Sequence, residues 1–290
     1  MRTPDYSGIF CIIFYFESEY CWGLKMVYAR LSVKLTPMVA CPFGRGYREY
    51  EPCGALKPYV RCFWTSEELD SSLIIPDLCA DIIFDFDKNT VFFCGVNDTP
   101  FKASDKTHSF GIRFYAWTAA LFSEDTLRGT LNGDFELGVH FRRLEREFAP
   151  QIFAAETTEQ RIALSELFLL KNLHERHNGL FTQAMGEIIE RRGTCAAGEI
   201  SKELHISSRQ LERVFAEYSG LSPKKMAALV RYQCLWRDIL LERDFSASEK
   251  ALEYGYVDQS HMLNDFRRFH TMSPKQARKN ALGAPKIIDE

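Results

Sequence analysis

The chain has 290 residues, of which 46% are hydrophobic and 26% are charged. These fractions are typical of a globular protein with a substantial core, and they exclude a fully disordered, collagen-like or coiled-coil chain. The formal net charge of -3 at pH 7 argues against a nucleic-acid-binding protein, because such domains are usually basic, although an average over two domains can hide a basic one.

The first apolar run of the chain, Ile9–Phe16, is too short to cross a membrane. A bilayer span needs about 20 apolar residues, whereas Glu17 follows this run at once and only Arg2 precedes it as a positive charge. We expect a buried strand or a poorly defined extension here, no membrane association and a cytoplasmic protein. Residues 1–45 as a whole match no recognisable domain and stay an unplaced N-terminal extension.

Nine cysteines are present, and seven of them lie between Cys11 and Cys94. Their number is odd and no C-x-x-C pair occurs, so neither a disulfide framework nor a zinc ribbon is indicated. We expect small buried thiols, no metal site and no cofactor.

Strand-like segments follow between Tyr59 and Phe114. Short runs rich in branched and aromatic residues are separated by turn-forming Pro and Asn, which is typical of β-structure. The predicted strands centre on 73–75, 82–84, 91–93 and 110–114.

After Trp117 the apolar residues recur at helical spacing, first over 137–148 and then over 158–173. Thr157 and Gln160 form a predicted capping box for the second of these helices. Asn178 and Gly179 interrupt the pattern before it resumes up to Gly193 and continues as helices to the C-terminus.

The order of strands first and helices afterwards predicts an α+β protein. We expect a β-rich, barrel- or cupin-like sensor or dimerisation domain over 46–178, with a helical end. A linker helix over 179–193 then leads to an all-α domain over 194–290.

The last hundred residues contain an internal repeat at an offset of 51. Seven pairs match, three of them identical: Leu211/Met262, Phe215/Phe266, Tyr218/Phe269, Leu221/Met272, Ser222/Ser273, Pro223/Pro274 and Lys224/Lys275. In each copy a short helix, a turn and a capped second helix with exposed polar residues at its start describe a helix-turn-helix. Between the copies, residues 224–242 form one predicted helix of about 28 Å, which approaches the pitch of one turn of B-DNA, about 34 Å.

At this point the sequence resembles the AraC-type (arabinose-regulator) family of bacterial transcription factors. The resemblance covers about 190–280 and rests on the segments Ile206–Phe215, Gly220–Pro223, Arg231, Gly255–Met262, Phe266–Phe269 and Met272–Pro274. It implies a transcription regulator whose two units bind successive major grooves of double-stranded DNA, with RNA polymerase as a partner. A weaker resemblance to the sensor half of a subgroup of such regulators rests on Tyr47–Tyr50, Leu56–Trp64, Ile75–Asp77, Asp81–Asp85 and Gly111–Phe114.

Positions at the start of each second helix are the candidates for DNA contact. The base-facing set is Ser208, Arg209, Glu212, Arg213, Gln259, Ser260, His261 and Asn264, and the phosphate set is Ser207, Lys224, Lys225, Arg267, Arg268, Lys275 and Lys279. Two positions depart from the family. His205 stands where Gly is common, and Asn264 stands where relatives often carry Arg. Arg231, in the connecting helix, is a candidate for a contact that fixes this helix to a neighbour.

An effector pocket is predicted in the aromatic-rich N-terminal domain, with Arg113 as the anchor for an acidic group. Its candidate residues are Asp81, Phe84, Arg113, Tyr115 and Trp117. A small-molecule effector and a homodimer are both compatible with this domain, and the sequence leaves activation and repression open.

Two alternatives remain beside a ligand-modulated, non-enzymatic regulator. One is a DNA-repair or demodifying enzyme with the same DNA-binding module, and the other is a dimeric regulator without an effector.

The net charge, when it is divided near the domain boundary, no longer argues against DNA binding. Residues 181–290 hold 17 Lys and Arg against 15 Asp and Glu, a net +2, whereas residues 1–180 hold 19 against 24, a net -5.

Overall fold

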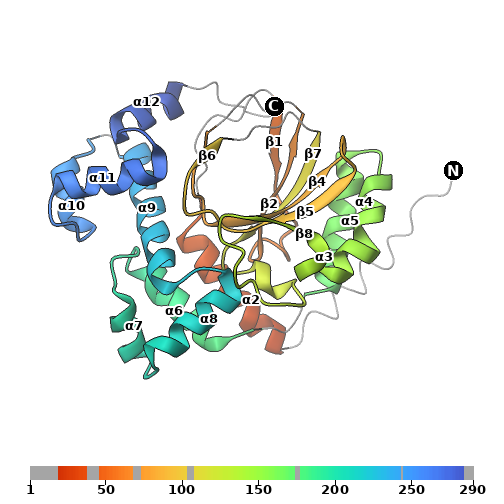
Figure 1. Ribbon diagram of the computed structural model, residues 1–290, viewed down its shortest axis with the longest axis horizontal. Helices are drawn as coiled ribbons and strands as arrows, with labels where there is room; N and C mark the ends of the chain where they lie inside the picture. Colours follow the sequence, from red (N-terminus) through yellow and green to blue (C-terminus); the bar gives the residue numbers. More distant parts are fainter. Residues whose placement is uncertain are drawn as a thin grey trace.

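The computed structural model describes residues 19–37, 46–67, 73–102, 108–173, 177–242 and 244–283. An N-terminal β-sheet domain is followed by a helical C-terminal region, as the α+β prediction requires (Figure 1). The predicted segment Ile9–Phe16 lies outside the described residues. None of the helices in the described part of the chain is long and apolar enough to cross a membrane.

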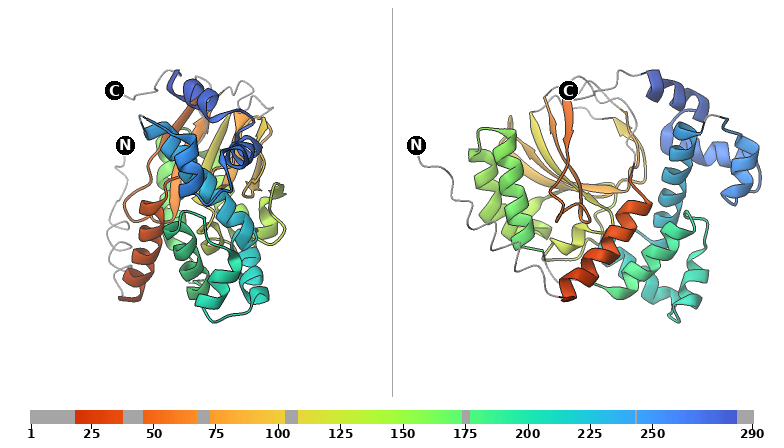
Figure 2. Two further views of the ribbon diagram at one scale, coloured as in Figure 1. Left: turned by 90° about the vertical axis from the view of Figure 1, so that its left-hand side faces the viewer. Right: turned by 180° about the vertical axis from the view of Figure 1, so that it is seen from behind.

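The N-terminal domain is built on a six-stranded antiparallel sheet of order β1-β2-β7-β4-β5-β8, and a separate pair, β3-β6, stands beside it. The strands are β1 Tyr47–Tyr50, β2 Val60–Ser66, β3 Leu73–Ile74, β4 Cys79–Asp85, β5 Thr90–Cys94, β6 Phe101–Lys102, β7 Ser109–Tyr115 and β8 Asp134–Glu136. The large sheet is strongly curved, and the β3-β6 pair lies across its concave side (Figures 1 and 2).

The two faces of the sheet differ because side chains alternate along each strand. On β4, Ile82 and Phe84 are fully buried on the convex side, where the ring of Phe84 contacts Phe148 and Phe153. Asp81 and Asp85 alternate with them and point to the concave side. The pattern Asp-Ile-Ile-Phe-Asp thus places an apolar core behind the sheet and charge in front of it.

Helices cover the convex face. They are α3 Leu137–His140, the π-helical turn η2 Leu144–Phe148, α4 Ala149–Ala154 and α5 Thr158–Lys171, and a short 3-10 turn, η1 Ala119–Leu121, precedes them. The single helix predicted over 137–148 is therefore broken at Phe141. The capping box that starts α5 is confirmed, since Thr157 Oγ1 accepts from Gln160 N at 3.2 Å while Gln160 Oε1 accepts from Thr157 N at 3.3 Å.

One helix was missed within the extension that the sequence left unplaced. Helix α2, Glu19–Lys34, packs against α6, Gly179–Glu190 (Figure 2). Tyr28 and Leu31 of α2 are buried, and Ser32 Oγ donates to the Pro58 carbonyl at 2.9 Å. Helix α2 therefore ties the start of the described chain to both halves of the molecule.

The C-terminal region consists of α7 Ala197–Glu203, α8 Ser208–Ser219, α9 Pro223–Leu241, α10 Ala247–Glu253, α11 Gln259–His270 and α12 Pro274–Gly283. Helix α6, predicted as a linker, packs against α8 and α9, and the ring of its Phe181 lies 5.1 Å from that of Phe215. One continuous hydrophobic core extends from the sheet through α6 into this region.

Candidate nucleic-acid interface and domain cavity

The first helix-turn-helix unit is defined by its turn and its caps. His205 has a φ of 53°, in the left-handed region where Gly is the usual residue, which explains why the family favours Gly there. Ser207 then caps α8 by accepting from Gln210 N at 3.2 Å, and Gly220 ends the helix at a φ of 72°.

The apolar stripe of α8 points inward and leaves its polar residues outside. Leu211, Val214 and Phe215 are buried, whereas all four predicted base-facing positions of this unit are exposed: Ser208, Arg209, Glu212 and Arg213. A cleft of about 580 Å³ runs along this surface, with Arg209 and Arg213 in its lining. Arg128, from the N-terminal domain, also lines it. Sequence reasoning missed Arg128, because its nearness to α8 depends on the packing of the two domains.

The second unit repeats the design with one more residue in its turn. Gly255 has a φ of 67°, and Asp258 Oδ1 accepts from His261 N at 2.7 Å to cap α11. Met262, Phe266 and Phe269 are buried. The base-facing candidates of this unit are all exposed: Gln259, Ser260, His261 and Asn264.

The phosphate candidates all lie at the surface, but several of the cations discussed in the sequence have partners within the protein. Within α11, Arg268 lies 3.9 Å from Asp265 Oδ1 and Arg267 donates to Asn264 Oδ1 at 3.3 Å. Lys225 Nζ lies 2.7 Å from Asp98 Oδ2 of the N-terminal domain. Arg231 forms an ion pair of 3.2 Å with Asp265 of α11, and its guanidinium lies 4.4 Å from the ring centre of Tyr256. Arg231 therefore fixes the connecting helix to the second unit. The remaining candidates, Ser207, Lys224, Arg267, Arg268, Lys275 and Lys279, are exposed.

Helix α9 connects the two units and has 19 residues, which correspond to a length of about 28 Å. A second cluster of charges fixes its far end. Asp238 of α9 pairs with Arg192, which follows α6, and with Lys250 of α10 at 3.1 Å, and it accepts from Tyr254 Oη at 2.8 Å. The contacts of Asp238 with Lys250 and Tyr254 thus fix the second unit to α9, and its contact with Arg192 fixes α9 to the end of α6.

The first unit is also docked on the N-terminal domain. Leu127 N donates to the Glu217 carbonyl of α8 at 2.9 Å, and Arg128 pairs with the Glu217 side chain at 3.6 Å. A Cβ at Gly220 would lie 2.6 Å from Thr130 Oγ1, so the turn after α8 fits closely against the 127–132 segment.

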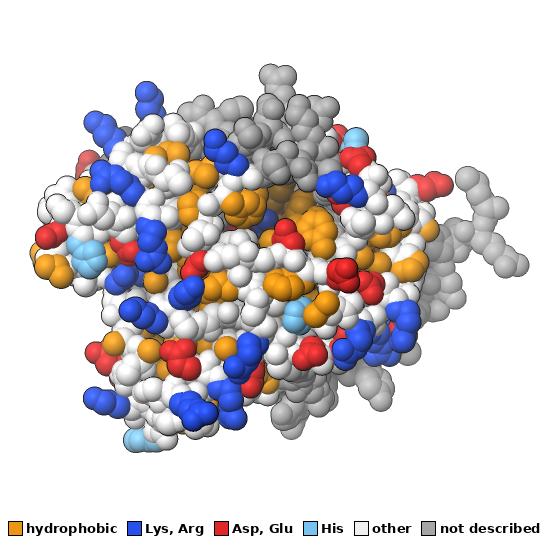
Figure 3. Space-filling model, viewed as in Figure 1, with side chains coloured by type: hydrophobic (Ala, Val, Ile, Leu, Met, Phe, Trp, Pro, Cys, Tyr) orange, Lys and Arg blue, Asp and Glu red, His pale blue; other side chains and the backbone are white. Residues whose placement is uncertain are grey.

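The concave side of the sheet holds a cavity of about 460 Å³. Figure 3 shows this face of the molecule hollowed, with hydrophobic side chains around the hollow. Its charged lining residues come from several strands and the loops between them: Asp77, Asp81, Asp85, Lys88, Lys102, Arg113 and Asp134.

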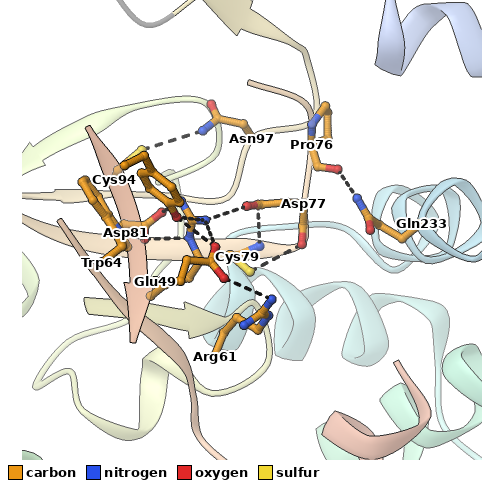
Figure 4. Close-up of polar contacts among 12 residues, drawn as sticks. Glu49, Arg61, Trp64, Pro76, Asp77, Cys79, Asp81, Cys94, Asn97 and Gln233 are labelled. Carbon is orange, nitrogen blue, oxygen red and sulfur yellow. Dashed lines mark hydrogen bonds and ion pairs between the residues drawn. The ribbon is translucent and has the colours of Figure 1, made fainter. Parts of the chain in front are cut away.

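Arg113 and Asp81, which both line this cavity, form a buried ion pair. Arg113 Nε lies 2.9 Å from Asp81 Oδ1 and Nη2 lies 3.3 Å from Oδ2. Trp64 Nε1 also donates to Asp81 at 2.9 Å (Figure 4). Gly111 makes this arrangement possible, because a Cβ there would lie 2.0 Å from the Trp64 indole. The nearby carboxylates keep the pKa of Arg113 well above its usual value despite its burial.

The structure does not bring the five predicted pocket residues together. Asp81 and Arg113 line the cavity, but Phe84 is buried behind the sheet. Tyr115 and Trp117 stack on each other, with ring centres 5.1 Å apart, and neither lines the cavity. The alternation of side chains along a strand explains the error, since Phe84 lies on the face opposite to Asp81. Arg113 is also no free anchor for an acid, because Asp81 already occupies it.

The thiols in the cavity are not activated nucleophiles. Burial raises the pKa of both Cys79 and Cys94 well above the usual value, and the carboxylates near them act in the same direction. A thiol-transfer enzyme needs the opposite, a cysteine whose thiolate is stabilised by positive charge. The surroundings of Cys79 and Cys94 therefore do not favour thiol transfer at these two cysteines.

Comparison with known protein families gives one match in the N-terminal half of the chain and one in the C-terminal half. A family described as a helix-turn-helix domain matches residues 200–280, and a domain of unknown function (DUF6597) matches residues 48–132. No curated protein matches the chain.

Among solved structures, the chain is similar to ToxT from Vibrio cholerae. One matching structure is the crystal structure of unsaturated fatty acid bound wild-type ToxT, which is 10% identical in sequence. That match covers 84% of this chain and 99% of the ToxT chain, with a TM-score of 0.34. A second structure, ToxT bound to (E)-4-(8-methylnaphthalen-1-yl)but-3-enoic acid, is 9% identical, and the match covers 82% of this chain and 100% of the ToxT chain with a TM-score of 0.39.

Proposed function

The chain carries an AraC-type helix-turn-helix domain at its C-terminus, and from this premise we propose that it is a sequence-specific DNA-binding transcription regulator with two DNA-reading units. The observation that carries the proposal is the pair of capped helices, α8 and α11, whose polar starts are exposed while their apolar stripes are buried. A helix held in this way can enter the major groove with its N-terminal residues against the bases.

The two units would bind successive major grooves on one side of the duplex. Support comes from the length of α9, about 28 Å, and from the charge clusters around Arg231 and Asp238 that hold the second unit in place. The first unit, with Arg209 and Arg213 exposed beside a cleft, would supply most of the base contacts. The second, whose exposed set is Gln259, Ser260, His261 and Asn264, would position the protein and read fewer bases.

The N-terminal domain would act as the sensor. It has a cavity of its own, and its contacts with α8 and α9 would transmit a change in that cavity to the DNA-binding surface. Recruitment of RNA polymerase and formation of a homodimer belong to the same proposal and are tested separately, by transcription with purified polymerase and by sedimentation.

A binding assay with DNA from upstream of the protein's own gene tests the DNA-binding role. We expect the double variant Arg209→Ala/Arg213→Ala to lose about 1–3 kcal/mol of binding free energy for each base contact removed, roughly a 5- to 150-fold weakening per residue. The matched control is Arg142→Ala/Arg146→Ala, which removes two exposed arginines of the N-terminal domain. Equal affinities of the two double variants for the specific site would contradict the assignment of α8 as a reading helix.

A further inference from the structure

The cavity in the N-terminal domain has an excess of buried negative charge. Three of its carboxylates, Asp77, Asp81 and Asp85, are buried, and Arg113 is the buried cation among its lining residues. The other charged lining residues, Lys88, Lys102 and Asp134, are exposed, and Lys88 Nζ lies 3.5 Å from Asp85 Oδ2. Ion pairs with Arg113 therefore cannot neutralise all of the buried carboxylates at once.

Arg113 is fully engaged. Besides the two contacts with Asp81, its Nη1 donates to Tyr47 Oη at 3.3 Å and lies 3.9 Å from Glu49 Oε1. An anionic ligand would have to displace Asp81 from this guanidinium and would then face three buried carboxylates. Acidic effectors are disfavoured by this arrangement.

Asp85 is satisfied locally, whereas Asp77 is not. Asp85 Oδ1 accepts from the backbone N of Asp87 and of Lys88, at 3.1 and 2.9 Å. Asp77 Oδ1 accepts from Cys79 N at 3.0 Å, but its Oδ2 lies 3.7 Å from Arg113 Nη1, too far for a hydrogen bond. Burial raises the pKa of Asp77, as expected for a carboxylate that its surroundings only partly compensate.

Ser66 provides a second polar group at the same cavity. Ser66 is 2% exposed and lines the cavity, and its Oγ has no hydrogen-bond partner among the described residues. A buried hydroxyl without a partner costs free energy that a bound donor or acceptor would recover.

The rest of the lining is apolar and aromatic. Ile74, Ile75, Ile83, Phe92 and Phe101 line the cavity together with Tyr47 and Trp64, whose ring centres lie 5.9 Å apart. A volume of about 460 Å³ is suited to a small organic molecule rather than to a single ion. Aromatic faces also attract organic cations.

We propose that this cavity binds a small organic cation, an amine with an apolar or aromatic body, whose charged group pairs with Asp77 while its body packs against the Trp64 side of the cavity. The inference deepens the sensor part of the proposed function, but ligand binding itself can be measured without DNA. Its recognition elements are the partly compensated carboxylate, the hydroxyl of Ser66 and the apolar walls.

A direct contact joins the cavity to the DNA-binding half. Pro76, next to Asp77 in sequence, accepts a hydrogen bond at its carbonyl from Gln233 Nε2 of α9 at 2.7 Å (Figure 4). Gln233 is 1% exposed, so this contact is shielded from water. A ligand that draws Asp77 toward itself moves the residue that contacts the connecting helix, and occupancy of the cavity would thereby alter DNA affinity.

Calorimetry on the full chain with three probes of similar shape tests the ligand class: 2-phenylethylamine, 2-phenylethanol and 3-phenylpropionate. We expect the amine to bind at least about tenfold more tightly than the alcohol and the acid to bind least, because only the amine gains a charged hydrogen bond with Asp77. Preference for the acid, equal affinity for all three, binding of none, or occupation by Mg²⁺ or Zn²⁺ alone would overturn the proposal.

Matched variants locate the site. Asp77→Asn keeps the shape of the side chain and is expected to remove the preference for the amine, and Ser66→Ala to weaken binding of the amine. Asp87→Asn, which removes an exposed carboxylate outside the lining, is expected to leave binding unchanged. Retention of the amine preference in a folded Asp77→Asn protein would contradict the assignment. Near-ultraviolet circular dichroism confirms folding of each variant.

The contact with α9 is tested by the DNA affinity with and without the amine. In Gln233→Leu we expect the amine to bind as in the unchanged chain but to lose its effect on DNA affinity. An undiminished effect of the amine on DNA in this variant would overturn the role of Gln233. A protein that binds the amine but no DNA would refute the proposed function and leave the ligand class standing.

Discussion

Single residues in the N-terminal domain contribute to stability through buried charge. Asp81 and Arg113 lie on adjacent strands, β4 and β7, and are directly paired in the register of the sheet. Both are almost fully buried, and each relies on the other for compensation. The sequence shows the two residues but not their pairing, because strand order and register depend on contacts between segments about 30 residues apart.

Arg113→Met is expected to destabilise the protein by about 3–5 kcal/mol, because it leaves Asp81 and Asp77 buried without a cation. Urea unfolding measures this loss, and Arg142→Met, at an exposed position, is the control. Arg113→Lys is expected to restore little, since a single ammonium cannot reproduce the two contacts with Asp81. Full stability of Arg113→Lys would show that geometry at this pair is unimportant.

A glycine at the domain contact gives a second residue-level prediction. Gly220 has a φ of 72°, and a Cβ there would lie 2.6 Å from Thr130 Oγ1 and 2.8 Å from the Leu127 carbonyl. Gly220→Ala is expected to lower the free energy of unfolding by at least about 1–2 kcal/mol, from backbone strain alone.

Gly186→Ala is the matched control for Gly220→Ala. Gly186 lies within α6, and a Cβ there would meet nothing within 4 Å. Because Ala is the better helix former, this substitution is expected to raise stability by up to about 1 kcal/mol. Thermal unfolding compares the two variants, and a Gly220→Ala protein as stable as Gly186→Ala would contradict the fit described for this turn.

At the scale of elements, local features were predictable and non-local ones were not. The caps at Thr157, Ser207 and Asp258 follow from residues three apart in sequence, and the structure confirms them. Helix α2 was missed because its apolar residues have no clear helical periodicity and owe their burial to packing against other parts of the molecule. The cavity was misassigned at Phe84 because the sequence does not reveal which face of β4 meets the helices.

Helix α11 contributes a buried imidazole whose protonation opposes folding. His270 is 2% exposed, shares a hydrogen bond of 2.8 Å with Tyr232 Oη, and stacks on Phe266. Burial lowers the pKa of His270 to about 4, whereas an unfolded histidine titrates near about 6.5. Between these two values the unfolded chain binds a proton that the folded chain does not, so stability falls as the pH falls.

The free energy of unfolding should therefore decrease by up to about 3 kcal/mol between about pH 6.5 and pH 4 on account of this group. Above about pH 6.5 this contribution is fully present. Denaturant unfolding across this range, compared between the unchanged chain and His270→Gln, isolates it, and His205→Gln at an exposed position is the control. An unchanged pH dependence in His270→Gln would contradict the prediction.

At the scale of the whole molecule, Lys225, which is predicted to contact a DNA phosphate, forms an ion pair with Asp98 of the N-terminal domain. Asp98 is 8% exposed and bonds to Lys225 at 2.7 Å and to Asn132 Nδ2 at 2.6 Å. Although burial opposes it, these hydrogen bonds lower the pKa of Asp98, so the carboxylate is ionised at neutral pH. In this arrangement Lys225 is directed toward the N-terminal domain.

Asp98→Asn is expected to release Lys225 and to raise DNA affinity by up to about fivefold, the upper range for an exposed ion pair. The dependence of log K on log salt should steepen by about one as Lys225 gains a phosphate. Asp87→Asn removes the same charge from an exposed turn and controls for the overall change. Identical affinity and salt dependence in the two variants would show that Lys225 does not reach DNA.

The close fit between the 127–132 segment and α8 also limits how the N-terminal domain could be joined to the DNA-binding half of another regulator. Because the Leu127 amide, Thr130 and Gly220 fit one another, a hybrid that joins this N-terminal domain to another DNA-binding half near residue 178 would bring together surfaces that are not complementary. Productive hybrids would need to exchange the 127–132 segment together with α8 and α9. The two halves of this chain are therefore fitted to each other at this contact, although each matches a separate domain family.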